Sequence, residues 1–178
     1  PDALNFIHNK KCFYIPNPSD KSFETLNNFN KSCNVDVFFA LSHGVHRGVL
    51  KTGKIDDRIL FLNDLKSRTP NIKFDIYGMN YIQPVWGSKF IKTIANSKMG
   101  LNLSRGKPVK YYSSDRLTQI TGNGLVTLID EKTGYHDFFN DNEMVFYKNL
   151  NDLSEKILKL SRDDKTRRSI GSKGKIKY

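Results

Sequence analysis

The feature that most constrains the fold of this chain is the regular alternation of short apolar runs with amphipathic stretches. The apolar runs have the length of β-strands and lie at residues 12–15, 35–41, 73–77, 99–103, 125–129 and 144–147. Stretches that suit helices or helical turns lie between or after them, at residues 21–31, 56–67, 88–96, 113–122, 135–139, 152–160 and 165–178. Strands that alternate with helices form parallel sheets. The sequence therefore predicts an α/β fold: a single Rossmann-like domain whose parallel sheet is covered by helices on both faces.

The composition supports one domain and favours anionic partners. The chain has 178 residues, 38% of them hydrophobic, which is enough for one domain with a core. The formal net charge of +11 favours nucleic acid, phosphorylated small molecules or an acidic membrane surface as the partner.

Cys12 and Cys33 lack metal-ligand spacing and suit reduced thiols of a cytoplasmic protein. No apolar run approaches the roughly 18 residues of a membrane-spanning helix. Because the chain begins at Pro1 and ends within a basic helical pattern, we expect it to be a piece of a longer protein.

One stretch, YYSSDRLTQITGNG at residues 111–124, has the organisation of a ligand site. Ser113, Ser114 and Asp115 stand where a helix begins, and Gly122 stands where it ends. The start of a helix exposes unpaired backbone N–H groups and a partial positive charge, which suit an anion. The same residues suit an ordinary capped helix equally well.

Three loops that follow the strands at residues 35–41, 73–77 and 99–103 carry polar or basic side chains. Because the carboxyl ends of parallel strands share one edge of the sheet, these loops are expected to converge there. The cations collected at this edge would be Arg47, Lys51, Arg105, Lys107, Lys110 and Arg116. This convergence favours a phosphate site over a set of solvated lysines. Tyr81 and Trp86, beside Pro84, could stack on a base or pack against the following helix.

Several other kinds of site are disfavoured. His43 and His46 are three residues apart with no carboxylate or cysteine nearby, which is a weak signal for a metal. The sequence has no serine in a G-x-S-x-G elbow, no G-x-x-x-x-G-K-[ST] loop and no G-x-G-x-x-G after the first strand. Serine hydrolase, P-loop and dinucleotide chemistry are therefore not expected.

Taken together, three segments resemble the C-terminal, donor-binding domain of GT-B glycosyltransferases. The likeness is to the bacterial group-one branch that includes spore-coat-maturation-like members. YIPNPSD at residues 14–20 is similar to the segment that joins the acceptor domain to the donor domain. DVFFALSHGVHRG at 36–48 resembles the first donor-domain strand with its phosphate loop, and SSDRLTQITGNGLV at 113–126 resembles the R-x-x-E-x-x-x-x-G element. The resemblance covers nearly the whole chain.

The resemblance implies a domain organisation and a function. Residues 1–20 would be a linker from a missing N-terminal domain, and residues 21–178 a nucleotide-sugar-binding domain with a truncated C-terminal helix. The implied activity is metal-independent glycosyl transfer in polysaccharide biosynthesis, to an acceptor held by the N-terminal domain. Implied partners are a nucleotide-diphosphate sugar and that N-terminal domain, with the anionic inner face of the plasma membrane as a further candidate. No nucleic acid, metal or other cofactor is expected.

The resemblance also implies roles for individual residues. Arg47, Lys51 and Lys110 would stabilise the leaving diphosphate. Donor-binding residues would be His43, Gly44, Tyr77, Gly78, Pro84, Val85, Trp86, Ser104, Arg105, Tyr112, Ser113, Ser114, Asp115, Arg116 and Gln119. Gln119 stands where the family has a glutamate on the ribose hydroxyls, and an amide lacks the charge-assisted hydrogen bond of a carboxylate. The alternatives are a non-catalytic nucleotide-binding α/β domain and a basic nucleic-acid-binding module.

Overall fold

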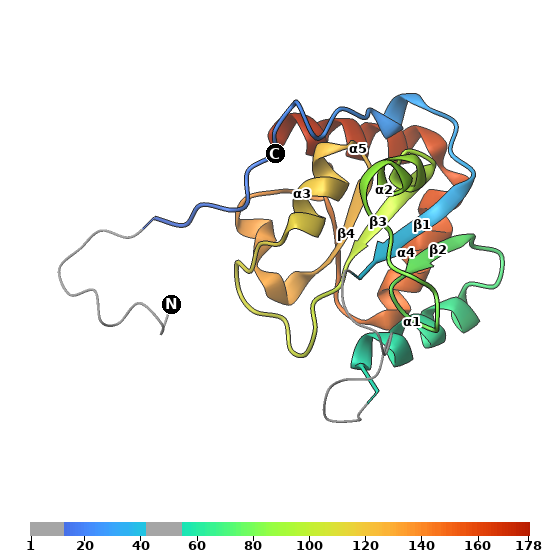
Figure 1. Cartoon of the computed structure of the whole chain (residues 1–178). Helices are drawn as coiled ribbons and strands as arrows, with labels where there is room; N and C mark the ends of the chain where they lie inside the picture. The colour runs from blue at the N-terminus through green and yellow to red at the C-terminus, as the bar shows by residue number, and fades with distance from the viewer. Residues whose placement is uncertain (1–12, 42–54) are drawn as a thin grey trace, which may run out of the picture.

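The core of the protein is a five-stranded sheet, seen in a computed structural model that describes residues 13–41 and 55–178. Its strands are β1 (Val35–Ala40), β2 (Phe74–Tyr77), β3 (Ser97–Asn102), β4 (Val126–Asp130) and β5 (Val145–Tyr147). They are hydrogen-bonded in the order β2-β1-β3-β4-β5, and every neighbouring pair is parallel (Figure 1). The α/β fold with a parallel sheet is therefore confirmed.

Helices cover both faces of this sheet, as predicted. They are α1 (Asp57–Arg68), α2 (Gly87–Ile94), α3 (Asp115–Gly122), α4 (Leu150–Arg162) and α5 (Asp164–Lys177), with short 3₁₀ turns η2 (Asn28–Asn30), η3 (Glu131–Thr133) and η4 (Tyr135–Asp137). Successive strand residues point to opposite faces: Val37 packs in one buried cluster with α1 and α4, and Phe38 in another with α2 and α3. In Figure 1, α2 and α3 lie on the near side of the strands and α4 on the far side.

The segment before β1 differs from the prediction. The described part of the expected strand at 12–15 does not pair with the sheet, and the expected helix at 21–31 is a turn followed by the 3₁₀ turn η2. The reason is a set of contacts from the far end of the chain. Lys175 Nζ donates to the carbonyls of Glu24 (3.0 Å) and Leu26 (2.7 Å). Arg168 Nη1 donates to the carbonyl of Phe29 at 2.8 Å. These carbonyls accept from side chains of α5 rather than from the next turn of a helix.

The basic helix α5 is an integral part of the domain. Arg167 is 1% exposed, and Ile170 is also buried. Two glycines allow the helix to approach its neighbours: a Cβ on Gly171 would lie 2.7 Å from the carbonyl oxygen of Gly124, and one on Gly174 would lie 2.3 Å from that of Glu143. The helix is thus packed on the domain rather than solvated all round.

The strand order creates a crevice at one place on the sheet edge. Strand β1 lies between β2 and β3, so the chain leaves β1 to one side for β2 and then returns to the other side for β3. In open parallel sheets, ligands bind beyond the carboxyl ends of the strands at such a switch point. The crevice therefore lies where β1 and β3 end, at Ala40 and Asn102.

Within the described ranges, no helix combines the length and apolar character needed to cross a membrane.

Candidate functional site

Arg116, in the first turn of α3, lies in the crevice between β1 and β3. Its Nε donates to the carbonyl of Ala40 at 3.1 Å, and its Nη1 donates to the carbonyl of Leu103 at 3.0 Å. The guanidinium also lies over the ring of Phe39, 4.9 Å from its centroid. One side chain thus joins the carboxyl ends of both strands and holds α3 against them.

The charge of Arg116 has no carboxylate partner among residues 13–41 and 55–178. Burial, together with the nearby positive charge of Arg58, lowers the pKa of Arg116 to about 10. The guanidinium therefore remains charged at neutral pH. A half-buried cation that lacks a counter-charge favours a bound anion, because the anion would restore the stabilisation that burial removes.

The start of α3 is not capped by a side chain. Ser114 occupies the N-cap position with an extended backbone, but its hydroxyl makes no cap and instead donates to Asn102 Oδ1 over a long 3.4 Å. In contrast, Asp56, Asn149 and Asp163 accept hydrogen bonds from the first turns of α1, α4 and α5. Among the described residues, no group accepts from the N–H groups of Asp115 and Arg116, which are thus left for a ligand or solvent.

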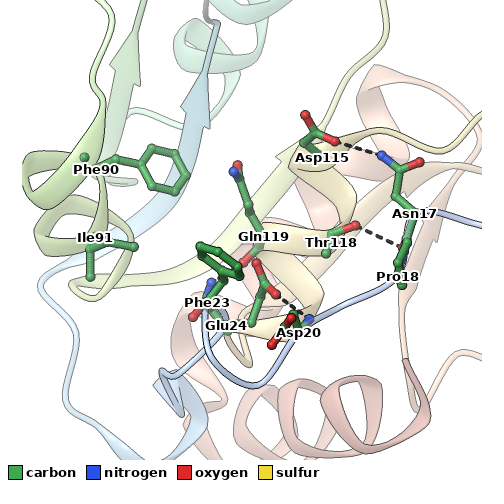
Figure 2. A pocket seen from close by; sticks show the side chains of 12 residues that line it. Asn17, Pro18, Asp20, Phe23, Glu24, Phe90, Ile91, Asp115, Thr118 and Gln119 are labelled. Atoms are coloured by element: carbon green, nitrogen blue, oxygen red, sulfur yellow. Dashed lines mark hydrogen bonds between the residues drawn. The ribbon is translucent and has the colours of Figure 1, made fainter.

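Three adjoining hollows surround this first turn of α3, and we name them the linker, central and basic hollows. The linker hollow, of about 520 Å³, is lined by Asn17, Pro18, Asp20, Phe23, Glu24, Gly87, Phe90, Ile91, Asp115, Thr118, Gln119 and Asn123 (Figure 2). The central hollow, of about 250 Å³, is lined by Phe38, Ala40, Leu41, Val85, Phe90, Tyr112, Ser114, Asp115, Arg116, Gln119 and Ile120. The basic hollow, of about 270 Å³, is lined by Arg58, Ser104, Arg105, Lys107, Val109, Tyr112, Ser114 and Arg116. Shared lining residues make them one continuous surface along α3.

The basic hollow gathers four cations from three segments. Arg105 and Lys107 come from the loop after β3 and Arg116 from α3, as the sequence predicted. Arg58, from the first turn of α1, was not predicted, because nothing in its local sequence separates it from an ordinary helix residue. Arg58 is buried and forms an ion pair with Asp56 at 2.7 Å. The hollow therefore has the positive charge and the concave shape that suit an anion.

Gln119 lies where the linker and central hollows meet. It is half-buried, and within the described residues its side-chain amide has no hydrogen-bond partner. Figure 2 shows the side chain extending from α3 toward Phe90 of α2. Val85 and Phe90 supply apolar walls to the central hollow. A flat apolar group and a hydroxyl-bearing group could therefore be held side by side here.

Ser113 and Asp115 are already engaged by Asn17. The backbone N–H of Asn17 donates to Ser113 Oγ at 2.9 Å, and its Nδ2 donates to Asp115 Oδ1 at 2.8 Å. The carbonyl of Asn17 accepts from Thr118 Oγ1 at 3.2 Å and from the hydroxyl of Tyr178 at 2.6 Å. The sequence interpretation placed Asn17 in the segment at residues 14–20 that joins two domains, and gave it no contact with α3.

Other predicted site residues lie apart from these hollows. The Nζ atom of Lys110 lies 3.7 Å from Oδ2 of Asp137 and over the ring of Tyr111. Tyr77 packs with the cluster under α2, and burial raises its pKa. Trp86 is 61% exposed at the start of α2. None of the three hollows is lined by Tyr77, Gly78, Pro84, Trp86, Lys110 or Ser113.

Gly78 has a backbone role instead. Its φ is +81°, and a Cβ there would lie 2.2 Å from the carbonyl oxygen of Leu41. It lets the loop after β2 pass close to the end of β1. His43, Gly44, Arg47 and Lys51 lie outside the described residues.

A metal centre has no support in the described ranges. No group of three or more His, Cys, Asp or Glu side chains there is placed to hold a metal ion.

Comparisons with known proteins agree with this architecture. A family model described as "Glycosyl transferase-like" matches residues 58–178. No curated protein matches the chain. Among solved structures, that of TarM shares 15% sequence identity with a TM-score of 0.57, over 93% of this chain and 34% of TarM. A mutant of S. aureus TarM in complex with fondaparinux, alpha-GlcNAc-glycerol and UDP shares 16% identity with a TM-score of 0.60, over 99% of this chain and 38% of that one. At such identities the likeness shows a shared fold, and the chain spans little more than a third of the TarM chains.

Proposed function

Since this chain belongs to the glycosyl transferase-like family, we propose that it binds the nucleotide-diphosphate sugar donor of a glycosyl transfer reaction. The acceptor would be held by an N-terminal domain of the same protein. The observation that carries this proposal is the uncapped start of α3 beside Arg116, a half-buried cation at the crevice between β1 and β3.

The diphosphate would lie over the start of α3 and the basic hollow. The N–H groups of the first turn, the remaining N–H groups of Arg116, and the side chains of Arg105 and Lys107 would surround it with donors and positive charge. Breaking the sugar–phosphate bond leaves extra negative charge on the nucleoside diphosphate. Fixed cations and helix N–H groups stabilise that charge as it develops. Arg47 and Lys51, which follow β1 in the sequence, are proposed to take part. Lys110 faces Asp137 instead and is left out of this role.

The nucleoside would lie across the central hollow. The base would contact Val85 and Phe90, and the ribose hydroxyls would bond to the amide of Gln119. An amide oxygen can accept from one hydroxyl while the NH₂ group donates to another. UDP is the first probe, because a solved structure with this fold is a complex with UDP.

The proposed reaction needs no metal. The cations around the basic hollow would neutralise the diphosphate, a task that Mg²⁺ or Mn²⁺ performs elsewhere. Donor binding is therefore expected to persist in EDTA, and a strict need for either ion would contradict this part of the proposal.

Calorimetry with UDP, its 2′-deoxy form dUDP, GDP and uridine tests the proposal. The parent chain is expected to prefer a nucleoside diphosphate to the bare nucleoside. Arg47→Ala should weaken diphosphate binding by about 1.5–3 kcal/mol, because a charge-assisted contact is lost, and Gln119→Ala by about 0.5–1.5 kcal/mol. The arginine variant should lose the preference for diphosphate, and the glutamine variant the preference for ribose over deoxyribose. A parent chain that bound neither UDP nor GDP would contradict the proposal.

A non-catalytic donor-binding role is a second candidate, favoured by one observation. Gln119 replaces the charged residue that the resembling family carries at this position. Sugar transfer by the full-length protein distinguishes the two roles: a catalytic parent should transfer sugar, whereas a binding-only parent should not. If the missing charge is the cause, Gln119→Glu should restore transfer to a binding-only parent.

A further inference from the structure

Asn17 uses three of its polar groups to hold the segment before the domain against the first turns of α3. Its backbone N–H and its side-chain Nδ2 donate to Ser113 and Asp115, and its carbonyl accepts from the hydroxyls of Thr118 and Tyr178. Pro16 and Pro18 flank it and restrict the backbone on either side. The contacts span roughly a hundred residues of sequence or more, so they are features of the tertiary fold and not of a local turn.

One consequence concerns the charge of Asp115. This carboxylate lies at the first residue of α3, where it suits the positive end of the helix. It also lines the linker and central hollows, beside the proposed diphosphate position. If its side chain were free, it could accept from the first N–H groups of α3. It would then compete with a phosphate for the same donors.

The observed position of Asp115 avoids that competition. Figure 2 shows its carboxylate turned toward Asn17, and Asp115 does not line the basic hollow, where the diphosphate is proposed to lie. The 2.8 Å hydrogen bond from Asn17 Nδ2 holds it there. Asp115 is exposed, so this one bond rather than burial fixes its side chain.

We propose that Asn17 is a positioning residue of the donor site, which holds the negative charge of Asp115 away from the diphosphate. The inference rests on the proposed function. It makes diphosphate affinity depend on the segment that precedes the domain, because any movement that withdraws Asn17 releases Asp115 toward the phosphate donors.

The test compares variants of the whole chain by calorimetry with UDP and with uridine at low salt. Asn17→Ala is expected to weaken UDP binding by about three- to tenfold, because the released carboxylate of Asp115 moves closer to the diphosphate and repels it. Uridine binding should change by less than about twofold, because uridine carries no charge. Asn30→Ala is the matched control: Asn30 is an exposed asparagine whose side chain makes no hydrogen bond with the described residues of α3.

A second variant separates positioning from simple loss of structure. In Asn17→Ala/Asp115→Asn the competing charge is absent, so UDP affinity should return to at least the parent value. If Asn17→Ala merely loosened the fold, UDP and uridine binding would weaken together, and the double variant would bind no better than the single one. That result overturns the inference, as does an Asn17→Ala variant that binds UDP like the parent. A parent chain that binds no nucleotide removes the proposed function and this inference with it.

Discussion

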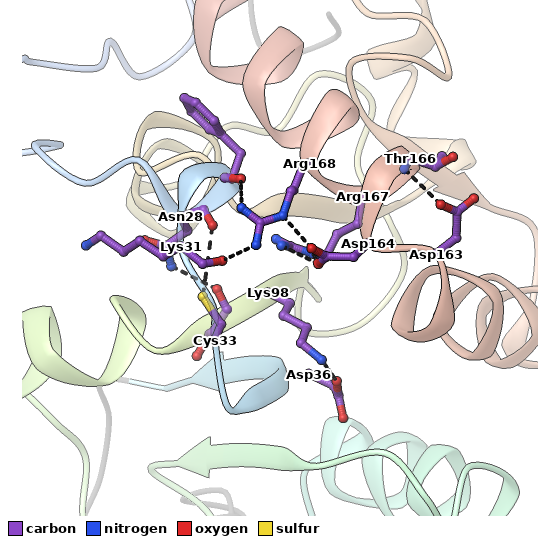
Figure 3. Close-up of polar contacts among 12 residues, drawn as sticks. Asn28, Lys31, Cys33, Asp36, Lys98, Asp163, Asp164, Thr166, Arg167 and Arg168 are labelled. Carbon is purple, nitrogen blue, oxygen red and sulfur yellow. Dashed lines mark hydrogen bonds and ion pairs between the residues drawn. The ribbon is translucent and has the colours of Figure 1, made fainter.

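Helices α3 and α5 use positive charge in opposite ways. Helix α5 carries a run of lysines and arginines, whereas Arg116 is the only cation of α3. Arg168 of α5 donates to the carbonyls of Phe29 and Lys31, and Arg167 is buried in an ion pair with Asp164 (Figure 3). Lys175 of the same helix donates to the carbonyls of Glu24 and Leu26. Arg116 also bonds to two carbonyls, but it lines two hollows and faces no carboxylate among the described residues.

The N-termini of the two helices also differ in whether their hydrogen-bond donors have partners. The carboxylate of Asp163 accepts from the N–H of Thr166 at 3.0 Å and so caps α5, whereas the side chain of Ser114, at the N-cap of α3, makes no capping hydrogen bond. The number of charges in a helix is therefore a poor guide to where an anion binds. What matters is which donors and cations the fold has left without an internal partner.

The largest effect on stability is expected when Arg167 of α5 is replaced. Arg167→Ala should lower the free energy of unfolding by about 2–4 kcal/mol, because a fully buried side chain and its packed methylene groups are removed. Urea unfolding measures it. Lys165→Ala, at an exposed position of the same helix, should change stability by no more than about 0.5 kcal/mol. UDP affinity should be unchanged in both variants under conditions in which they are folded. An Arg167→Ala variant as stable as the parent would mean that the buried side chain of Arg167 contributes little to the free energy of unfolding.

Arg116 and Arg168 allow the comparison to be made between two arginines that both donate to carbonyls. Arg116→Ala should weaken UDP binding by about 1.5–3 kcal/mol, since it removes a charge-assisted contact. Arg168→Ala should leave UDP binding unaltered and lower only the free energy of unfolding, by about 1 kcal/mol. Calorimetry and urea unfolding on both variants separate the two effects. Equal losses of UDP affinity would show that the charge of the whole domain, and not the crevice, attracts the nucleotide.

A third prediction concerns the cap of α3. Ser114→Asp would give α3 the kind of cap that Asp163 gives α5. A carboxylate at the N-cap should raise the free energy of unfolding by about 0.5–1 kcal/mol and weaken UDP binding by a similar amount, because it occupies the N–H groups and adds a negative charge. Ser114→Ala is the control that removes the hydroxyl without adding a cap. Unchanged UDP binding in Ser114→Asp would place the diphosphate elsewhere.

Patterns that are local in the sequence predicted much of this structure. The apolar runs at 35–41, 73–77, 99–103, 125–129 and 144–147 correspond to the five strands, within one or two residues at each end. The expected start of a helix at residues 113–115 coincides with the start of α3. The resemblance to a GT-B donor domain is confirmed by the family match and the shared fold.

What the sequence did not predict depends on polar contacts between distant segments. The expected helix at 21–31 is absent because Arg168 and Lys175 hold that segment from α5. Arg58 joins the basic hollow and Asn17 joins α3 only through the folded arrangement of the chain. Hydrophobic periodicity indicates which face of a helix or strand is buried, but it does not indicate which side chain will donate a hydrogen bond to a given carbonyl or carboxylate. The site residues therefore stay predictions, although several of them share one surface.

The smallest expected effect concerns the cap of α5 and its dependence on pH. Hydrogen bonds from Thr166 lower the pKa of Asp163 below its ordinary value of 3.8. A carboxyl group whose pKa is lowered by folding stabilises the protein above its unfolded pKa, and that contribution is lost as the pH falls through the folded pKa. In Asp163→Asn the amide oxygen can still cap the helix, so only the contribution of the charge is removed. Urea unfolding should therefore show the variant slightly less stable than the parent at pH 7, with the difference fading below pH 3.8. The uncapped α3 supplies the contrast: Ser114→Asn adds no titrating group there, so its difference from the parent should be the same at both pH values. A gap between parent and Asp163→Asn that persisted at pH 2 would show that the charge of Asp163 is not what distinguishes the two helix starts.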